Sequence, residues 1–272
     1  MKDAYLRVRS LITALVLLVV TSMSAQAQEG ADGFLSNLHS FRVSNYMALD
    51  AYYRFSGTGD TDTLNEIVQG INAANDAMNY LTGSDSTALS DEELSSLNQE
   101  FDKFKNLMRD NINDVRNRGY PDLRLVSDMA NQALTMNEKA TELYRIAQES
   151  SQTETSPRVE AARSAAVKMA QMMAKYSVRT NSSVAQTFQG SDLEVPLDEQ
   201  ARELDKLLAS VAQGESSPEL KATLDDITSK WQFIRGSYIN YNENNVGFVI
   251  DRYSKGILEG LATTIQLLKG NA

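Results

Sequence analysis

The chain has 272 residues, with 36 aspartates and glutamates against 26 lysines and arginines, which gives a formal net charge of −10. This acidic balance argues against a nucleic-acid-binding role, because no basic surface is available to release counterions from phosphates. The absence of cysteine and the presence of a single histidine, His39, exclude disulfides, thiolate or histidine-rich metal sites and cysteine-linked haem.

The first residues have the composition of a secretory signal peptide. Three basic residues precede the apolar run of residues 11–20, and the small-residue sequence AQA follows at residues 25–27. Even when it is extended to residue 23, the apolar run has about 13 residues, fewer than the roughly 20 that span a bilayer. We therefore expect cleavage after Ala27 and a periplasmic mature protein that does not span the membrane. An uncleaved anchor is the alternative.

The first half of the chain predicts four helices. Apolar residues spaced three and four apart predict a helix over about residues 33–56, with one seam formed by Phe34, Leu38, Phe41, Asn45, Ala48, Tyr52 and Phe55. A second helix follows the turn SGTGD, a third begins at the capping-box residues Ser90 and Glu93, and a fourth follows Pro121. The polar run ESSQTETS predicts a module boundary, so residues 28–150 form the first expected module.

The second half repeats this plan. Its first helix begins with Ser156, which can cap it, and Pro157, which fits the first turn. The apolar seam of this helix consists of Val159, Ala162, Ala166, Met169, Met173 and Tyr176. Further helices are predicted from Pro196, Pro218 and Val246, which makes residues 151–272 the second module. Strand signals are absent. The sequence predicts an all-α fold of two tandem up-and-down four-helix bundle modules after a cleaved signal peptide, residues 1–27.

One helical stretch resembles a known family. The sequence QMMAK at residues 171–175 is similar to the end of the opening helix of PilJ-like modules, the extracytoplasmic helical sensors of type IV pilus chemotaxis transducers, which are related to nitrate-sensor domains. Arg42-Val43 and Met47-Ala48 are similar to the same motif in the first half, and Trp231 is similar to a family tryptophan. The resemblance implies a chemotaxis-related sensory module that binds a ligand.

The chain also departs from the family pattern. The family arginine, whose guanidinium would hold an anion through two hydrogen bonds, falls at Val167 or Lys168 in the second half, so only Arg42 retains it. Family members continue into a transmembrane helix and a signalling tail, whereas this sequence ends at Ala272. The resemblance therefore implies a sensor module that passes its signal to a partner protein of the envelope.

Four residues are candidates for ligand binding. Arg42 and Lys168 flank their seams and could present an anion site between modules or between the subunits of a homodimer, with a solvated flank as the alternative. Asn45 is a polar residue on an apolar seam, where it either faces a ligand or fixes the register of the helices. Gln171 is a candidate through the family resemblance.

No residues are spaced for catalysis, because neither an isolated carboxylate pair nor a Gly-rich phosphate loop occurs. Met169, Met172 and Met173 could bind monovalent copper through sulfur, but Met169 and Met173 fall on the helical seam, which favours packing in the core. His39 is interpreted as a partly exposed helix residue. We therefore expect no enzyme activity, no cofactor and no metal.

These patterns predict an exported, non-enzymatic, sensor-type helical protein that recognises a small molecule or ion and signals through an envelope partner. The alternative is a structural or adaptor protein of the cell envelope, which presents helical faces to a protein partner and binds no small ligand.

Overall fold

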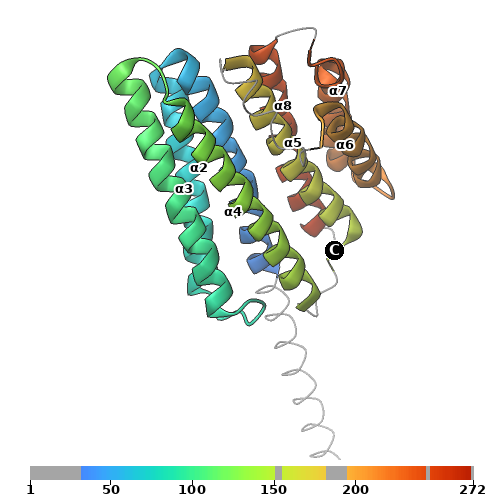
Figure 1. Cartoon of the computed structure of the whole chain (residues 1–272). Helices are drawn as coiled ribbons and strands as arrows, with labels where there is room; N and C mark the ends of the chain where they lie inside the picture. The colour runs from blue at the N-terminus through green and yellow to red at the C-terminus, as the bar shows by residue number, and fades with distance from the viewer. Residues whose placement is uncertain (1–31, 151–154, 182–194, 243–245, 271–272) are drawn as a thin grey trace, which may run out of the picture.

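The computed structural model describes residues 32–150, 155–181, 195–242 and 246–270. These ranges contain eight helices and no strand, which confirms the predicted all-α class (Figure 1). They are the helix of residues 32–58, α2 (Thr61–Gly83), α3 (Asp91–Arg118), α4 (Leu123–Ser150), α5 (Pro157–Asn181), α6 (Leu197–Ala212), α7 (Pro218–Ile239) and α8 (Gly247–Gly270). The expected signal peptide lies outside the described residues. Within them, no helix combines the length and the apolar character that crossing a bilayer requires.

Local sequence signals fix several helix ends. The Glu93 N–H donates to the Ser90 hydroxyl at 3.3 Å, and the Ser90 N–H donates to the Glu93 carboxylate at 2.8 Å, so the predicted capping box begins α3. Pro157 and Pro218 are the first residues of α5 and α7, where the missing N–H has no intrahelical partner to lose. Gly119 ends α3 in the left-handed conformation, with a φ of 82°.

The buried apolar residues form two clusters. The first core cluster combines helix 32–58 with α2, α3 and α4, and the second combines α5, α6, α7 and α8. Every residue of the predicted seams on helix 32–58 and on α5 is buried, including Asn45. We call helix 32–58 with α2–α4 the first helix set and α5–α8 the second helix set. Their division into tandem modules at residue 150 stays a prediction.

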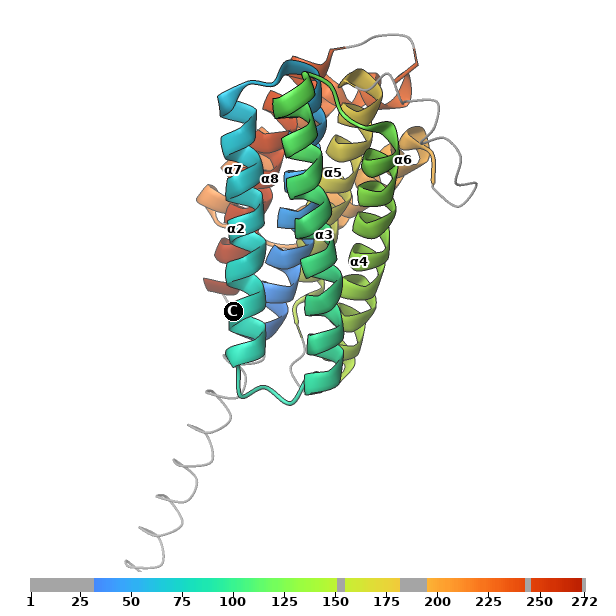
Figure 2. The same ribbon diagram turned by 60° about the vertical axis from the view of Figure 1, so that its left-hand side comes forward.

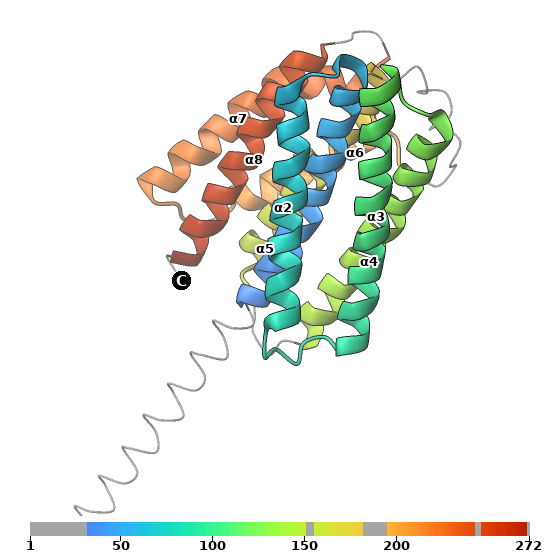
Figure 3. The same cartoon turned by 90° about the vertical axis from the view of Figure 1, so that its left-hand side faces the viewer.

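The two helix sets lie side by side, with helix 32–58 and α5 between the two cores (Figures 1 and 2). Val43 and Met47 of helix 32–58 pack against the second core, whereas Ala174 and Val178 of α5 belong to the first. In the second set α5 and α7 each contact both α6 and α8, and α7 and α8 are inclined to α2 and α3 (Figure 3). The alanine-rich α5 is therefore the central helix of the molecule, since its small side chains admit neighbours on several sides.

Helix 32–58 and α5 run parallel and in register. Ser36 contacts Arg163 and Asp50 contacts Ser177, and the two residues of each pair are 127 positions apart. The last helix, α8, runs antiparallel to helix 32–58, because Lys269 contacts Ser36. These contacts carry polar side chains into the interface between the sets at both ends of helix 32–58.

Candidate ligand site between the helix sets

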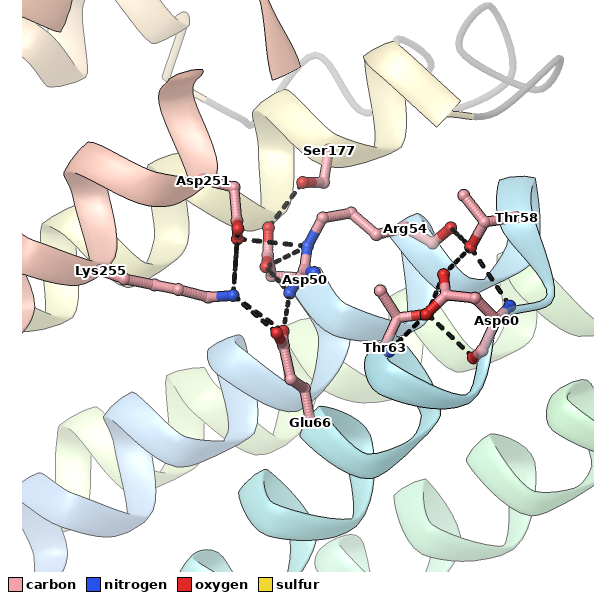
Figure 4. Close-up of polar contacts among 9 residues, drawn as sticks. All are labelled: Asp50, Arg54, Thr58, Asp60, Thr63, Glu66, Ser177, Asp251 and Lys255. Atoms are coloured by element: carbon pink, nitrogen blue, oxygen red, sulfur yellow. Dashed lines mark hydrogen bonds and ion pairs between the residues drawn. The ribbon is translucent and has the colours of Figure 1, made fainter. Parts of the chain in front are cut away.

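Two groups of charged side chains lie at opposite ends of the interface between the helix sets. The cationic cluster, near the start of helix 32–58, consists of Asp32, Ser36, His39, Arg42, Tyr144, Glu160, Arg163 and Lys269. The acidic cluster, near the end of the same helix, consists of Asp50, Arg54, Glu66, Ser177, Asp251 and Lys255 (Figure 4).

Arg163 of α5 is the centre of the cationic cluster, and its side chain is only 1% exposed. One terminal nitrogen donates to the Tyr144 hydroxyl at 3.1 Å and to the Glu160 carboxylate at 2.8 Å. The other donates at 2.9 Å to both Asp32 and Ser36 of helix 32–58. One buried guanidinium therefore ties α5 to α4 and to helix 32–58, and its charge is matched by carboxylates on two elements.

Arg42 lies on the other side of Tyr144, with its guanidinium carbon 4.9 Å from the centre of the ring. Its Nε atom is buried and has no hydrogen-bond partner in the part of the chain that the structure describes. Burial lowers the pKa of Arg42, because desolvation outweighs the attraction of Tyr144, Tyr46 and Glu160. No described carboxylate forms an ion pair with it, so its positive charge is only weakly compensated.

His39 and Asn45 stand three residues before and three residues after Arg42, so they share its side of the helix. Asn45 is 0% exposed, and neither its side-chain oxygen nor its nitrogen has a described partner. The Nδ1 atom of His39 is also buried and without one. Desolvation, with the charges of Arg163, Arg42 and Lys269, lowers the pKa of His39 to about 3, so the imidazole is neutral at pH 7.

These atoms give the cationic cluster a definite chemistry. It contains three cations, Arg42, Arg163 and Lys269, against two carboxylates, Asp32 and Glu160. Buried polar atoms in folded proteins are nearly always hydrogen-bonded, so the unpartnered Nδ1 of His39, Nε of Arg42 and side-chain amide of Asn45, at intervals of three residues on one helix, call for a bound group. Because the surplus charge is positive and guanidinium and amide N–H groups are donors, a small anion fits this group best.

The structure separates the four predicted site residues. Arg42 and Asn45 lie together on helix 32–58 beside the cationic cluster. Lys168 is instead ion-paired with Glu203 of α6, at 2.7 Å. Gln171 is half-buried on α5 and forms no hydrogen bond with another described residue. Lys168 thus contacts a different partner helix from Arg42.

The structure also tests the interpretations of the three methionines and of His39. Met169, Met172 and Met173 are each at most 1% exposed and belong to the second core, as the packing interpretation predicts. His39 is half-buried, in agreement with its interpretation as a partly exposed helix residue, and its Nδ1 atom is buried.

Sequence reasoning missed Arg163 and Asp50, both at most 1% exposed. A signal existed for each. Arg163 follows two alanines and lies between the seam residues Ala162 and Ala166, and Asp50 lies between apolar residues that occupy the core.

Within the described ranges, no three histidine, cysteine, aspartate or glutamate side chains are arranged to hold a metal ion. Comparison of the chain with protein-family models, curated proteins and solved structures found no match.

Proposed function

We propose that this protein is an exported, non-enzymatic recognition protein that binds a small anion at the cationic cluster and passes its occupancy to an envelope partner. The observation that carries this proposal is Arg42, a guanidinium that no described carboxylate pairs, between the unpartnered Nδ1 atom of His39 and the unpartnered side-chain amide of Asn45. An anion at this point accepts hydrogen bonds from the Nε group of Arg42 and the Nδ2 group of Asn45, and it balances the surplus positive charge.

The proposed architecture is two tandem up-and-down four-helix modules. The parallel register of helix 32–58 and α5 supports a duplication, because equivalent helices of two like modules meet side by side about a local twofold axis. The cross-contacts support it as well. Tyr144, on the last helix of the first set, contacts the first helix of the second set, and Lys269, on the last helix of the second set, contacts helix 32–58.

This arrangement gives binding a mechanical consequence. The cationic cluster takes residues from helix 32–58, α4, α5 and α8, so an anion there contacts elements of both helix sets. Small shifts of helices across such an interface are a common way for helical proteins to transmit occupancy. A partner protein that contacts both sets would sense the shift.

The test is thermal unfolding of the mature protein with sodium nitrate, sulfate, phosphate, acetate and citrate at constant ionic strength. A binding anion stabilises the folded state by about 2.7 kcal/mol at a hundredfold excess over its Kd, which raises Tm in a concentration-dependent way. Constant ionic strength separates binding from screening.

Two single variants, one at Arg42 and a matched one at Lys168, make the test specific to the proposed site. Arg42→Met removes the proposed anion contact, and Lys168→Met removes the same charge from a residue that Glu203 already neutralises. We expect the anion response to disappear in the first variant and to persist in the second. If no anion raises Tm, or if both variants respond equally, the anion proposal is wrong.

An adaptor role is the second candidate, and two exposed aromatic residues favour it. Phe233 on α7 is 63% exposed and Phe248 at the start of α8 is 78% exposed, and aromatic side chains are enriched in protein interfaces. A photo-crosslinking residue at position 248 would test this role in envelope extracts, with position 120 as the control because Tyr120 is 62% exposed. A discrete adduct from position 248 alone, together with no anion response, would favour the adaptor.

A further inference from the structure

The acidic cluster joins the helix sets through Asp50, whose side chain is 1% exposed. Its Oδ1 atom accepts a hydrogen bond from the Ser177 hydroxyl of α5 at 2.6 Å. Its Oδ2 atom accepts from Nη2 and Nε of Arg54, at 3.0 and 3.1 Å (Figure 4). Asp50 is therefore the buried polar link between helix 32–58 and α5 at this end of the interface.

The charges of this cluster do not balance. Three carboxylates, Asp50, Glu66 and Asp251, face two cations, Arg54 and Lys255. A surplus negative charge in a partly desolvated group is costly, and a bound proton removes it at less cost than an unpaired buried carboxylate.

The contacts decide which carboxylate takes the proton. Glu66 pairs with both Arg54 and Lys255 and is 35% exposed, so solvent and two cations stabilise its ionised form. Asp251 also lies beside both cations, 3.0 Å from Lys255 and 3.3 Å from Arg54, and is 18% exposed. The only cation that pairs with Asp50 among the described residues is Arg54, which Asp50 shares with the other two carboxylates, and the Asp50 side chain is almost completely buried.

We propose that Asp50 is a proton-binding site and that the packing of the two helix sets is linked to proton uptake there. A protonated Asp50 donates to Ser177 or accepts from it, and still accepts from Arg54 through its other oxygen. The cluster then holds two carboxylates and two cations. This inference does not rest on the anion site, whose residues Arg42 and Asn45 belong to the other cluster.

The surrounding groups agree with this assignment. The titratable and charged groups that face the cluster are Arg54 from helix 32–58, Glu66 from α2, Asp251 and Lys255 from α8, and Tyr238 from α7. Burial raises the pKa of Asp50 above its usual value, against the opposing effect of Arg54. Burial raises the pKa of Glu66 as well, but hydrogen bonds from Arg54 and Lys255 bring it below its usual value.

The direction of the pH effect follows from these shifts. An acid whose pKa is raised on folding binds its proton more tightly in the folded state, so stability falls as the pH rises through the folded-state pKa. Asp50 therefore tightens the interface on acidification. Glu66 has the opposite sign, because a lowered pKa contributes stability that is lost when the pH falls through it.

Two charge-neutralising variants with nearly unchanged shape separate the possibilities. Between pH 8 and pH 5, we expect Asp50→Asn to have a higher urea midpoint than the wild type, with the largest difference at pH 8 and a smaller one as the pH falls toward the folded-state pKa of Asp50. Glu66→Gln should lower the midpoint throughout this range, because it removes a partner of two cations. The contribution of His39 cancels in the difference between wild type and variant. A midpoint for Asp50→Asn that falls at pH 8 as far as that of Glu66→Gln overturns the proposal.

A second measurement uses the wild-type chain and needs no folded variant to succeed. Carboxyl carbon NMR follows the titration of each aspartate, and the Asp50 resonance should titrate above the ordinary aspartate value of about 3.9. Titration of Asp50 below that value would show an ordinary ion-paired carboxylate. Either result leaves the anion test at Arg42 unaffected, so the two proposals fail separately.

Discussion

The cationic and acidic clusters both connect helix 32–58 to the second helix set, but their charge imbalances have opposite signs. The cationic cluster has one cation too many and contains unpartnered donors around Arg42. The acidic cluster has one carboxylate too many, and nearly all of its charged groups are paired. The imbalances cancel over the whole interface, but each has to be satisfied where it lies.

Distance explains why the two clusters cannot neutralise each other. Arg42 and Asp50 are eight residues apart on one helix, which is about 12 Å along its axis. Direct hydrogen bonds are impossible at that separation, so each cluster needs its own counter-charge. In our two proposals, an anion balances the cationic cluster and a proton balances the acidic cluster.

The largest effect on stability is expected from a substitution of Arg163. Arg163→Met removes a buried guanidinium that bonds four groups on three elements, including the carboxylates of Asp32 and Glu160. Because breaking a buried ion pair typically costs 3–5 kcal/mol, we expect a fall of about that size in the free energy of unfolding. Urea denaturation measures it.

A matched variant shows whether burial is the cause. Arg235 also bonds a carboxylate, Asp205, through two nitrogens, but its side chain is 39% exposed and lies away from the interface. Arg235→Met should cost about 1 kcal/mol or less, since solvent screens the pair. If both variants lose the same free energy of unfolding, the buried position of Arg163 at the interface does not strengthen its contribution to stability.

The second test is the acid sensitivity of the cationic cluster. The pKa of His39 is about 3 in the folded protein and about 6.5 when unfolded, so the unfolded state binds a proton that the folded state refuses. Stability contributed by neutral His39 is complete above pH 6.5 and falls as the pH drops. At pH 5 this effect lowers the free energy of unfolding by about 2 kcal/mol relative to pH 7. We expect His39→Gln to abolish this part of the pH dependence. A pH dependence that is unchanged in the variant would show that the imidazole reaches solvent in the folded state.

A third test compares two buried asparagines. Asn45 has no described partner, whereas Asn111 accepts from the Tyr52 hydroxyl at 3.1 Å and donates to the carbonyls of Leu107 and Leu125. We expect Asn45→Leu to raise the free energy of unfolding by about 1–2 kcal/mol in anion-free buffer and to weaken the anion response. Asn111→Leu should instead lower the free energy of unfolding by about 1–3 kcal/mol, because the substitution leaves buried polar groups without their hydrogen-bond partner. Destabilisation of both variants by the same amount would mean that Asn45 already has its hydrogen bonds.

The helices could be predicted from the sequence because their signals are local. The three-four spacing from Phe34 to Phe55 marks the buried side of helix 32–58, and Ser90 with Glu93 marks the start of α3. Arg42 and Asn45 also became candidates from local signals, since each is a polar residue on or beside an apolar seam. Each of these signals can be read from the sequence of a single helix.

The rest of the interface could not be predicted in this way. The contacts of Arg163 with Asp32 and of Asp50 with Ser177 join residues more than 120 positions apart. They depend on the register between two helices, and apolar periodicity does not specify that register. For the same reason the sequence grouped Lys168 with Arg42, because both flank a seam, although Lys168 lies against α6.

The smallest expected effect is therefore at Lys168. Its side chain is 22% exposed and its partner Glu203 is 46% exposed, so solvent screens most of their attraction. We expect Lys168→Met to change the free energy of unfolding by less than about 0.5 kcal/mol. Arg42→Met should raise the free energy of unfolding in anion-free buffer, since it removes a desolvated charge that lacks a described carboxylate. Urea denaturation measures the free energy of unfolding of both variants. A clear loss of stability in Arg42→Met would show that other groups of the protein already compensate the charge of Arg42.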